Sequence, residues 1–313
     1  MTDVQDWEPL EIRPEDVGTR PGTAGLVEYL KGHPGFDALL VENKAVVFRD
    51  FAVPESELEP VLDLLLPNRL AYVHGNSPRT KVGENVYTST EYPRELTISM
   101  HNELSYSARW PSRLLFYCAV APGSGGATPV VDGVKWLASL EDEVRQAFAQ
   151  GVRYSQNLHD GLGLGKSWQD TFETDDRDTV EAFLAGSAAE WEWKGDGSLR
   201  VSQVRPATVR HPVTGAEVWF NQSDQWHPAA LGDETAAELA ELLPADELPQ
   251  SVTFADGSPI PGEYAIQVRD RGLAAAVDVD WRQGDLLLID NVLVGHGRRP
   301  FTGDRKVLVA MTD

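Results

Sequence analysis

The sequence predicts a mainly β protein with helical insertions, of the sandwich or jelly-roll type. Short apolar segments bounded by Gly and Pro occur in both halves of the 313-residue chain, around 86–133 and again at 277–313. Between them lie segments in which apolar residues recur at helical spacing. Strands in both halves with helices between them favour a layered β core that the helices decorate.

The N-terminal part of the chain is expected to be largely helical. Residues 24–43 predict one or two short helices, a strand follows at 44–51, and 55–66 has apolar residues at helical spacing. We expect residues 1–313 to form a single domain with this helical N-terminal segment and further helical insertions, since single large β domains reach this length.

The middle and C-terminal parts predict short strands and three helices. Strands are expected at 86–90, 96–104, 113–120, 127–133 and 151–158, within 200–222 around a turn at 211–216, within 277–301, and at 305–313. Helices are expected at 134–151, which ends on a Gly, at 174–186 and at 234–244.

Composition narrows the classes of partner. With 42% hydrophobic and 24% charged residues the chain is typical of a globular protein, and its net charge of −22 argues against nucleic acid or an anionic membrane as partner. Cys118 is the only cysteine, which excludes an intramolecular disulfide and fits a reducing cytoplasm. The N-terminal residues show no apolar signal core, and no apolar run approaches the ~20 residues of a membrane span. We therefore expect a cytoplasmic protein that acts on a small molecule.

The segment "SMHNELSY" places an imidazole and a carboxylate two residues apart. If 96–104 is a strand, the side chains of His101 and Glu103 point to the same face. Such a pair forms either two ligands of a metal ion or an ordinary hydrogen bond. A metal site would need a third ligand from another part of the chain.

Four later histidines are candidates for that third ligand. His211 lies in the turn "HPVTG", where solvent exposure is expected, and His227 precedes a Pro. The other two candidates are His159 and His296, and His296 differs because it follows a turn, an apolar strand, an Asp-Asn turn and a second strand. Two His and one carboxylate on one face of an octahedral ion leave three positions open, which suits Fe(II) in an oxygenase. Zinc would prefer four tetrahedral ligands.

Several of these segments resemble those of a known family. "VYTSTEYP", "MHNELSY", "PGSGGATPVVDG", "VWFNQSDQWHP" and "GDLLLIDNVLVGHGRRPFTGDRKVLVAM" are similar to the Fe(II)/2-oxoglutarate-dependent dioxygenases of the TauD/TfdA type, with most likeness to the SyrP-like branch found beside nonribosomal peptide biosynthesis. The likeness spans residues 70–313. It implies a double-stranded β-helix (jelly-roll) core, Fe(II) as cofactor, and 2-oxoglutarate and O2 as co-substrates.

The resemblance also assigns residues. Thr128 stands 27 residues after the first His, where the family has a threonine that contacts 2-oxoglutarate. Arg305 matches the family's co-substrate arginine, whose guanidinium can hold the distal carboxylate through two parallel hydrogen bonds. Lys306 is the alternative if the register shifts by one residue. The implied iron ligands are His101, Glu103 and His296.

The expected substrate is a small polar molecule of specialised metabolism, namely an amino acid, either free or tethered to a carrier protein as a thioester. The SyrP-like resemblance motivates this expectation. The taurine enzyme's sulfonate-binding arginine would fall near Val309 or Ala310 and is absent, so taurine is disfavoured. A carboxylate at Glu103 argues against halogenation and for hydroxylation of an sp³ carbon, or for desaturation or ring formation. The candidate substrate contacts are Arg79, Ser105, Phe220 and Gln222.

Two other classes remain open at this point. The chain could be a non-catalytic jelly-roll protein that binds a carbohydrate or a structural metal, which would not need a co-substrate arginine. It could also be a zinc or manganese cupin-like hydrolase or isomerase. Iron-dependent turnover of 2-oxoglutarate separates the oxygenase from both.

Overall fold

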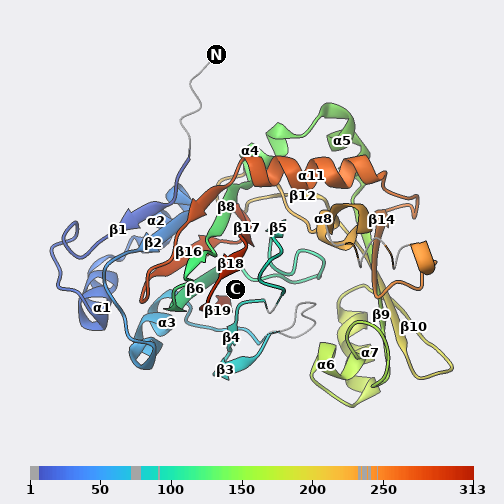
Figure 1. Ribbon diagram of the computed structural model, residues 1–313, viewed down its shortest axis with the longest axis horizontal. Helices are drawn as coiled ribbons and strands as arrows, with labels where there is room; N and C mark the ends of the chain where they lie inside the picture. The colour runs from blue at the N-terminus through green and yellow to red at the C-terminus, as the bar shows by residue number, and fades with distance from the viewer. Residues whose placement is uncertain are drawn as a thin grey trace.

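The computed structural model describes the chain except for residues 1–6, 72–78, 91, 232–233, 235–237, 239–240 and 245. Two β-sheets form its centre (Figure 1). The larger sheet has the order β1-β2-β16-β6-β19-β4-β3 and the smaller has the order β15-β8-β17-β5. Apart from the parallel pair β1–β2, neighbouring strands in both sheets run antiparallel. These packed sheets confirm the mainly β fold that the sequence predicts.

The strands of the two sheets are short, as expected. In the larger sheet they are β1 (Leu10–Ile12), β2 (Ala45–Phe48), β16 (Leu286–Asp290), β6 (Arg113–Val120), β19 (Lys306–Thr312), β4 (Val86–Thr88) and β3 (Lys81–Gly83). In the smaller sheet they are β15 (Val277–Val279), β8 (Thr128–Asp132), β17 (Val294–Arg298) and β5 (Ile98–His101).

The larger sheet is buried on both faces, which explains why its strands read as continuous apolar runs. Along β6, Leu114, Phe116 and Cys118 belong to the core cluster shared with the smaller sheet. Residues between them, such as Leu115 and Tyr117, join a second cluster with the N-terminal helices. The alternation of side chains along a strand thus divides one sequence between two cores.

The N-terminal helices cover the outer face of the larger sheet, at the left of Figure 1. They are α1 (Thr23–Gly32), α2 (Phe36–Asn43), the 3₁₀ turn η1 (Glu55–Glu57) and α3 (Glu59–Leu65). The two short helices, the strand and the third helix all lie where the sequence predicts them.

The single helix expected at 134–151 is wrong, because the chain breaks there into α4 (Gly133–Ser139), α5 (Asp142–Ala147) and the turn η2 (Phe148–Gln150). Leu140 at the break has an extended backbone and a buried side chain. The side-chain oxygen of Gln267 accepts a hydrogen bond from the Glu141 N–H, which starts the second helix. Tertiary contacts therefore divide a segment whose local pattern is continuous.

A further sheet with the order β10-β11-β9-β14 lies beside the two central sheets, at the right of Figure 1. Its strands are β9 (Val152–Leu158), β10 (Glu190–Trp193), β11 (Leu199–Arg205) and β14 (Gln250–Phe254). The helices α6 (Trp168–Phe172) and α7 (Arg177–Gly186) pack on it through a separate apolar cluster.

The remaining elements connect these sheets. They are the pair β7 (Ser124–Gly125) and β18 (Phe301–Thr302), the hairpin β12 (Thr208–Arg210) and β13 (Glu217–Trp219), and the helices α8 (Ser223–Trp226), α9 (Pro228–Leu231) and α11 (Gly262–Ala274). Five of the eleven residues of the helix expected at 234–244 lie outside the described residues. Among the described residues, no helix combines the length and apolar character needed to cross a bilayer.

Candidate metal centre

Pairing between β5 and β17 brings two histidines together. His101, the last residue of β5, lies directly opposite His296 of β17 in the strand register. Their ring centroids are 4.2 Å apart. Glu103 follows two residues after His101, and the ligand atoms of the three side chains all lie within 4.8 Å of one another. All three side chains are buried. The structure thus brings together the three groups that the sequence singled out.

Glu103 does not lie on the strand, as the sequence suggested, but in a turn that follows it. The turn is held by Asn291, whose Oδ1 accepts a hydrogen bond from the Glu103 N–H at 2.8 Å and whose Nδ2 donates to the Glu103 carbonyl at 3.1 Å. Asn102 Nδ2 donates in return to the Asn291 carbonyl at 2.7 Å. These bonds replace strand pairing, and Leu104 next to Glu103 takes a positive φ of 55°.

Both imidazoles are suited to bind a metal because burial lowers the pKa of His101 and His296 and keeps them neutral. Nδ1 of His101 lies 3.0 Å from the Ser99 carbonyl, which also accepts a hydrogen bond from the Gln225 side-chain nitrogen at 2.9 Å. With its hydrogen on Nδ1, the ring donates to Ser99 and leaves Nε2 for a ligand bond. Neither Gln225 nor Asn291 was predicted as part of the site. The Asp-Asn turn before His296 was the one sequence signal for the second.

The two histidines open onto a pocket that other predicted site residues also line. Its described lining brings together the predicted Thr128, Arg305 and Arg79 with both histidines. The lining residues are Arg79, Ser89, Thr90, Ile98, His101, Phe116, Thr128, His296, Gly297, Arg298 and Arg305.

Arg305 reaches the pocket, and Lys306 does not. The Arg305 Nε donates to the Gly126 carbonyl at 3.0 Å and Nη1 donates to Ser89 Oγ at 3.3 Å. Burial, together with the charge of Arg298, lowers the pKa of Arg305 to about 10, so the guanidinium stays protonated at neutral pH. Lys306 instead contacts Glu55 at 2.5 Å on the surface. Of the two alternatives for the co-substrate cation, the geometry favours Arg305.

The described lining carries three arginines and no acidic residue. Arg298 donates three hydrogen bonds to the backbone carbonyls of Tyr92, Pro93 and Leu96, at 2.5–2.9 Å. Arg79 contacts Glu103 with 2.6 Å between Nη2 and Oε2, and both side chains are 3% exposed. This positive pocket stands out in a chain with a net charge of −22.

The other three candidate substrate contacts do not line this pocket. Ser105 is buried, Phe220 packs against Trp110 with 4.8 Å between ring centroids, and the Gln222 amide donates to the Asn102 carbonyl at 2.8 Å. Gln222 thereby holds the backbone between two residues of the metal centre. Contact of these three side chains with substrate stays a prediction.

The expectation that His211 is exposed to solvent was wrong. Its side chain is buried, and Nε2 lies 3.0 Å from Asp290 Oδ2 at the end of β16. Asp290 Oδ1 accepts hydrogen bonds from the N–H groups of Val292 and Leu293. His211 of the "HPVTG" turn is therefore buried against the connection between β16 and β17. This contact supports β17, the strand that carries His296.

Comparison with known proteins agrees with this geometry. The model of the "Taurine catabolism dioxygenase TauD, TfdA family" matches residues 30–312. The chain belongs to this family. It is 37% identical over 292 residues to the dapdiamide synthesis protein DdaC of Enterobacter agglomerans, covering 93% of this chain and 88% of that protein. It is 31% identical over 285 residues to the clavaminate synthase-like protein At3g21360 of Arabidopsis thaliana, covering 88% and 83%.

Solved structures share the fold. PvcB of Pseudomonas aeruginosa superposes with a TM-score of 0.53 at 15% identity, covering 99% of this chain and 88% of PvcB. Another PvcB structure, described as an Fe, α-ketoglutarate dependent oxygenase from an isonitrile synthetic pathway, gives 0.52 at 16% identity, with 99% and 89% covered. Family membership confirms the Fe(II)/2-oxoglutarate-dependent oxygenase class expected from the sequence, and it disfavours the zinc, manganese and non-catalytic alternatives.

Proposed function

We propose that this oxygenase hydroxylates an sp³ carbon of an amino acid or a closely related small polar substrate. Fe(II) is held by His101, Glu103 and His296, and 2-oxoglutarate is held by Arg305 and Thr128. The observation that carries the assignment is the convergence of two paired histidines and one carboxylate at a pocket whose described lining contains three arginines and no acid.

The three ligand residues fit iron. Two neutral imidazoles and one carboxylate, with ligand atoms within 4.8 Å of one another, are the donor set that Fe(II) takes in oxygenases of this kind. The bound iron supplies the activation of O2, coupled to oxidation of 2-oxoglutarate to succinate and CO2, that a hydrocarbon C–H bond needs.

The other residues bind, orient and exclude water. The Arg305 guanidinium is placed to bind the distal carboxylate of 2-oxoglutarate as a charge-assisted pair, and the Thr128 hydroxyl adds a hydrogen bond. Phe116 packs on His296 with 5.0 Å between ring centroids and keeps that side of the imidazole dry. Asn291 fixes the backbone of Glu103, and the Ser99 carbonyl fixes the orientation of the His101 ring.

The substrate class rests on chemistry and on the relatives. Arg79 lines the pocket beside Glu103 and is the candidate partner for a substrate carboxylate. DdaC is named for dapdiamide synthesis, and PvcB belongs to an isonitrile synthetic pathway. Both support a role in specialised metabolism. An amino acid tethered to a carrier protein lacks the free carboxylate, so the two substrate forms make different demands on Arg79.

A screen for succinate formation tests this function. Iron-loaded protein is given 2-oxoglutarate and each amino acid, free or as a carrier-protein thioester, and product is identified by mass spectrometry. If the substrate is free, Arg79→Ala weakens its binding and leaves substrate-independent 2-oxoglutarate decay intact. Because Arg79 also contacts Glu103, iron affinity is measured first and assays use saturating iron. Arg94→Ala, on an exposed side chain paired with Glu95, is the control.

If the substrate is tethered, the Arg79 change has little effect and the thioester outcompetes the free acid. Failure to turn over any amino acid in either form contradicts the substrate class. It leaves the oxygenase class standing, because substrate-independent consumption of 2-oxoglutarate reports on that class separately.

A further inference from the structure

A tryptophan stands directly behind the Thr128 hydroxyl. Trp281 follows β15, the strand whose Val279 pairs with Thr128 of β8. The indole Nε1–H lies 3.0 Å from Thr128 Oγ1, and both side chains are buried, with 7% of Trp281 and 2% of Thr128 exposed. Thr128 lines the pocket, whereas Trp281 is not part of its described lining.

The direction of this hydrogen bond is fixed by chemistry. An indole N–H can only donate, so the Thr128 oxygen must accept. The hydroxyl hydrogen is then left for another acceptor, and within the described part of the chain the hydroxyl forms no other hydrogen bond. The guanidinium groups in the lining, of which Arg305 is one, offer only donors. The Thr128 hydroxyl can therefore donate to an oxygen of a ligand in the pocket.

Arg305, like Thr128, is held in position by hydrogen bonds to other groups of the protein. The Gly126 carbonyl and the Ser89 hydroxyl accept hydrogen bonds from Arg305 Nε and Nη1, which fixes the plane of its guanidinium. Gly126 and Thr128 lie in one short turn and strand start, where Gly126 has a positive φ of 72°. One backbone segment thus orients both groups that are placed to bind an anion.

We propose that Trp281 is a positioning residue for 2-oxoglutarate. Its indole N–H occupies an acceptor site of the Thr128 oxygen, turns the hydroxyl hydrogen toward the pocket, and strengthens it as a donor to the carboxylate by polarising the O–H bond. This role rests on the proposed binding of 2-oxoglutarate at Arg305 and Thr128. Trp281 itself does not touch the co-substrate.

The test is a double-mutant cycle read out by equilibrium binding. Trp281→Phe removes the N–H and retains an aromatic ring, and Thr128→Val removes the hydroxyl with little change of shape. Binding of 2-oxoglutarate to the Mn(II)-loaded protein is measured by calorimetry without oxygen. We expect each single variant to weaken binding about three- to tenfold, as the loss of one hydrogen bond does, and the double variant to be no weaker than the weaker single variant.

A matched control comes from Trp168→Phe. Trp168 is 3% exposed and its Nε1 donates to Asp160 Oδ1 at 3.2 Å, so the change removes the same chemical group from a similarly buried ring in a separate apolar cluster. It should lower thermal stability without changing 2-oxoglutarate affinity. If Trp281→Phe fails to fold, β-(3-benzothienyl)alanine at position 281 replaces the N–H by sulfur in a ring of the same shape.

Three outcomes would overturn the proposal. Binding of 2-oxoglutarate by Thr128→Val with the affinity of the parent protein would show that the hydroxyl is not a contact. The two substitutions could show additive effects, so that Trp281 acts by packing alone. Unchanged affinity in Trp281→Phe would show that Thr128 needs no partner. Thr128→Ser should keep both the affinity and its sensitivity to Trp281→Phe. Absence of 2-oxoglutarate binding in the parent protein would instead contradict the proposed function.

Discussion

Two buried arginine–carboxylate pairs in this protein have the same components and opposite surroundings. Arg79 meets Glu103 at the pocket, and Arg49 meets Asp285 at the edge of the larger sheet. The side chains of all four residues are at most 8% exposed. Burial of such a pair costs desolvation energy in both places, so the difference between them lies in what else the charges contact.

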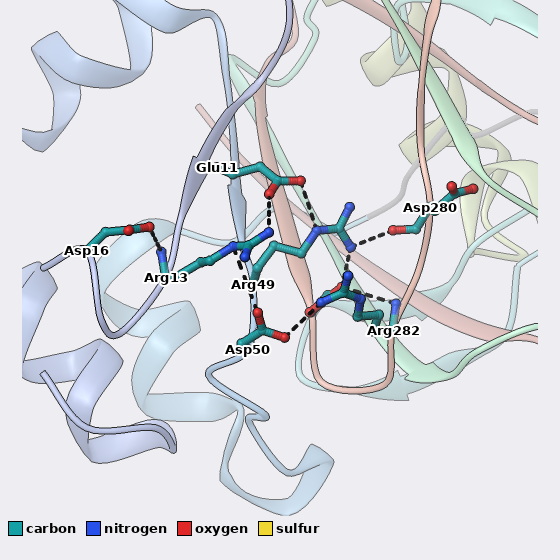
Figure 2. Close-up of polar contacts among 8 residues, drawn as sticks. Glu11, Arg13, Asp16, Arg49, Asp50, Asp280 and Arg282 are labelled. Atoms are coloured by element: carbon teal, nitrogen blue, oxygen red, sulfur yellow. Dashed lines mark hydrogen bonds and ion pairs between the residues drawn. The ribbon is translucent and has the colours of Figure 1, made fainter.

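Arg49 is surrounded by acceptors (Figure 2). Besides Asp285, its guanidinium donates to Glu11 Oε1 at 3.1 Å and to the Asp280 carbonyl at 2.6 Å. The Arg282 N–H donates to the same Asp285 oxygen at 3.1 Å. The contacts of Arg49 with Asp280 and Asp285 tie the end of β2 to the segment before β16, and its contact with Glu11 ties it to β1. The protein itself supplies these partners, and we interpret the network as structural.

The pair Arg79–Glu103 at the pocket has the opposite surroundings. Arg79 and Glu103 lie among two further arginines and two neutral histidines, and no acidic residue belongs to the described lining. The positive charge that remains is suited to the dianion 2-oxoglutarate, and Glu103 is suited to a divalent metal. A buried pair is thus a sign of function when its surroundings leave charge for a ligand, and a sign of architecture when the protein itself satisfies that charge.

The largest expected effect comes from the metal centre. His101→Ala, Glu103→Ala and His296→Ala should each abolish iron-dependent succinate formation, because two ligands hold Fe(II) much less firmly than three. Circular dichroism should show a retained fold for the two histidine variants, since both side chains line the pocket. Iron content after anaerobic loading is the direct measurement. Turnover by the His296→Ala protein would exclude His296 as a ligand.

A slightly smaller loss of activity is expected when Arg305, the residue proposed to bind 2-oxoglutarate, is replaced. Arg305→Ala should raise the KM for 2-oxoglutarate by an amount equivalent to about 2–5 kcal/mol, the loss from breaking a buried charge-assisted pair. Lys306→Ala is the matched control, because its ammonium contacts Glu55 on the surface. Initial rates over a range of 2-oxoglutarate concentrations decide the matter, and the reverse ranking would mean that the register is shifted by one residue.

The structural pair should respond in stability and not in co-substrate binding. Arg49→Ala leaves Asp285 buried without its guanidinium partner and should lower the free energy of unfolding by about 3–5 kcal/mol. Urea denaturation measures this change. Arg13→Ala at the exposed end of the same network, where Arg13 Nε is 3.8 Å from Asp50, should change the free energy of unfolding far less. A changed KM for 2-oxoglutarate in folded Arg49→Ala protein would contradict the distinction between the two regions.

The sequence predicted the parts of this fold that local pattern determines. Apolar runs bounded by Gly and Pro located β6, β8, β16, β17 and β19, and helical spacing located the N-terminal helices. It missed α11, whose buried face is only the narrow stripe Ala265, Val268 and Gly272. Gly272 is buried because Trp136 packs on it, with its ring 2.7 Å from where a Cβ would stand. A contact 136 residues away in sequence leaves no local signal.

In the candidate site, too, the sequence revealed some residues, and others depend on tertiary contacts. His101, Glu103 and His296 could be named because the residue types and the family resemblance pointed to them. The groups that position the site could not, because Asn291 at Glu103, Gln225 at the Ser99 carbonyl and Trp281 at Thr128 act through contacts set by the tertiary fold. The burial of His211 was missed for the same reason: a turn sequence indicates the turn and not what packs over it. Ser105, Phe220 and Gln222 as substrate contacts remain predictions.

Asp224 on α8 extends the comparison to a buried carboxyl that forms no ion pair within the described chain. Its side chain is fully buried beside Ser99, and burial raises the pKa to about 7 from an ordinary 3.8. The folded state therefore holds a proton that the unfolded state has lost between these two values. By linkage, the contribution of this group to stability is fully present below pH 3.8 and is lost as the pH rises through about 7.

Replacing Asp224 by Asn removes the titration and keeps the size. The unfolding free energy of the metal-free parent protein should thus fall relative to that of Asp224→Asn as the pH rises from 5 to 8, with the steepest part below pH 7. Urea denaturation of both proteins at each pH gives the difference directly. Glu192→Gln, at an exposed position on β10, should follow the parent curve. Parallel curves for the parent and Asp224→Asn would mean that the Asp224 carboxyl is already ionised in the folded protein at pH 5, so that the charge of Arg269, which lowers its pKa, outweighs the effect of burial.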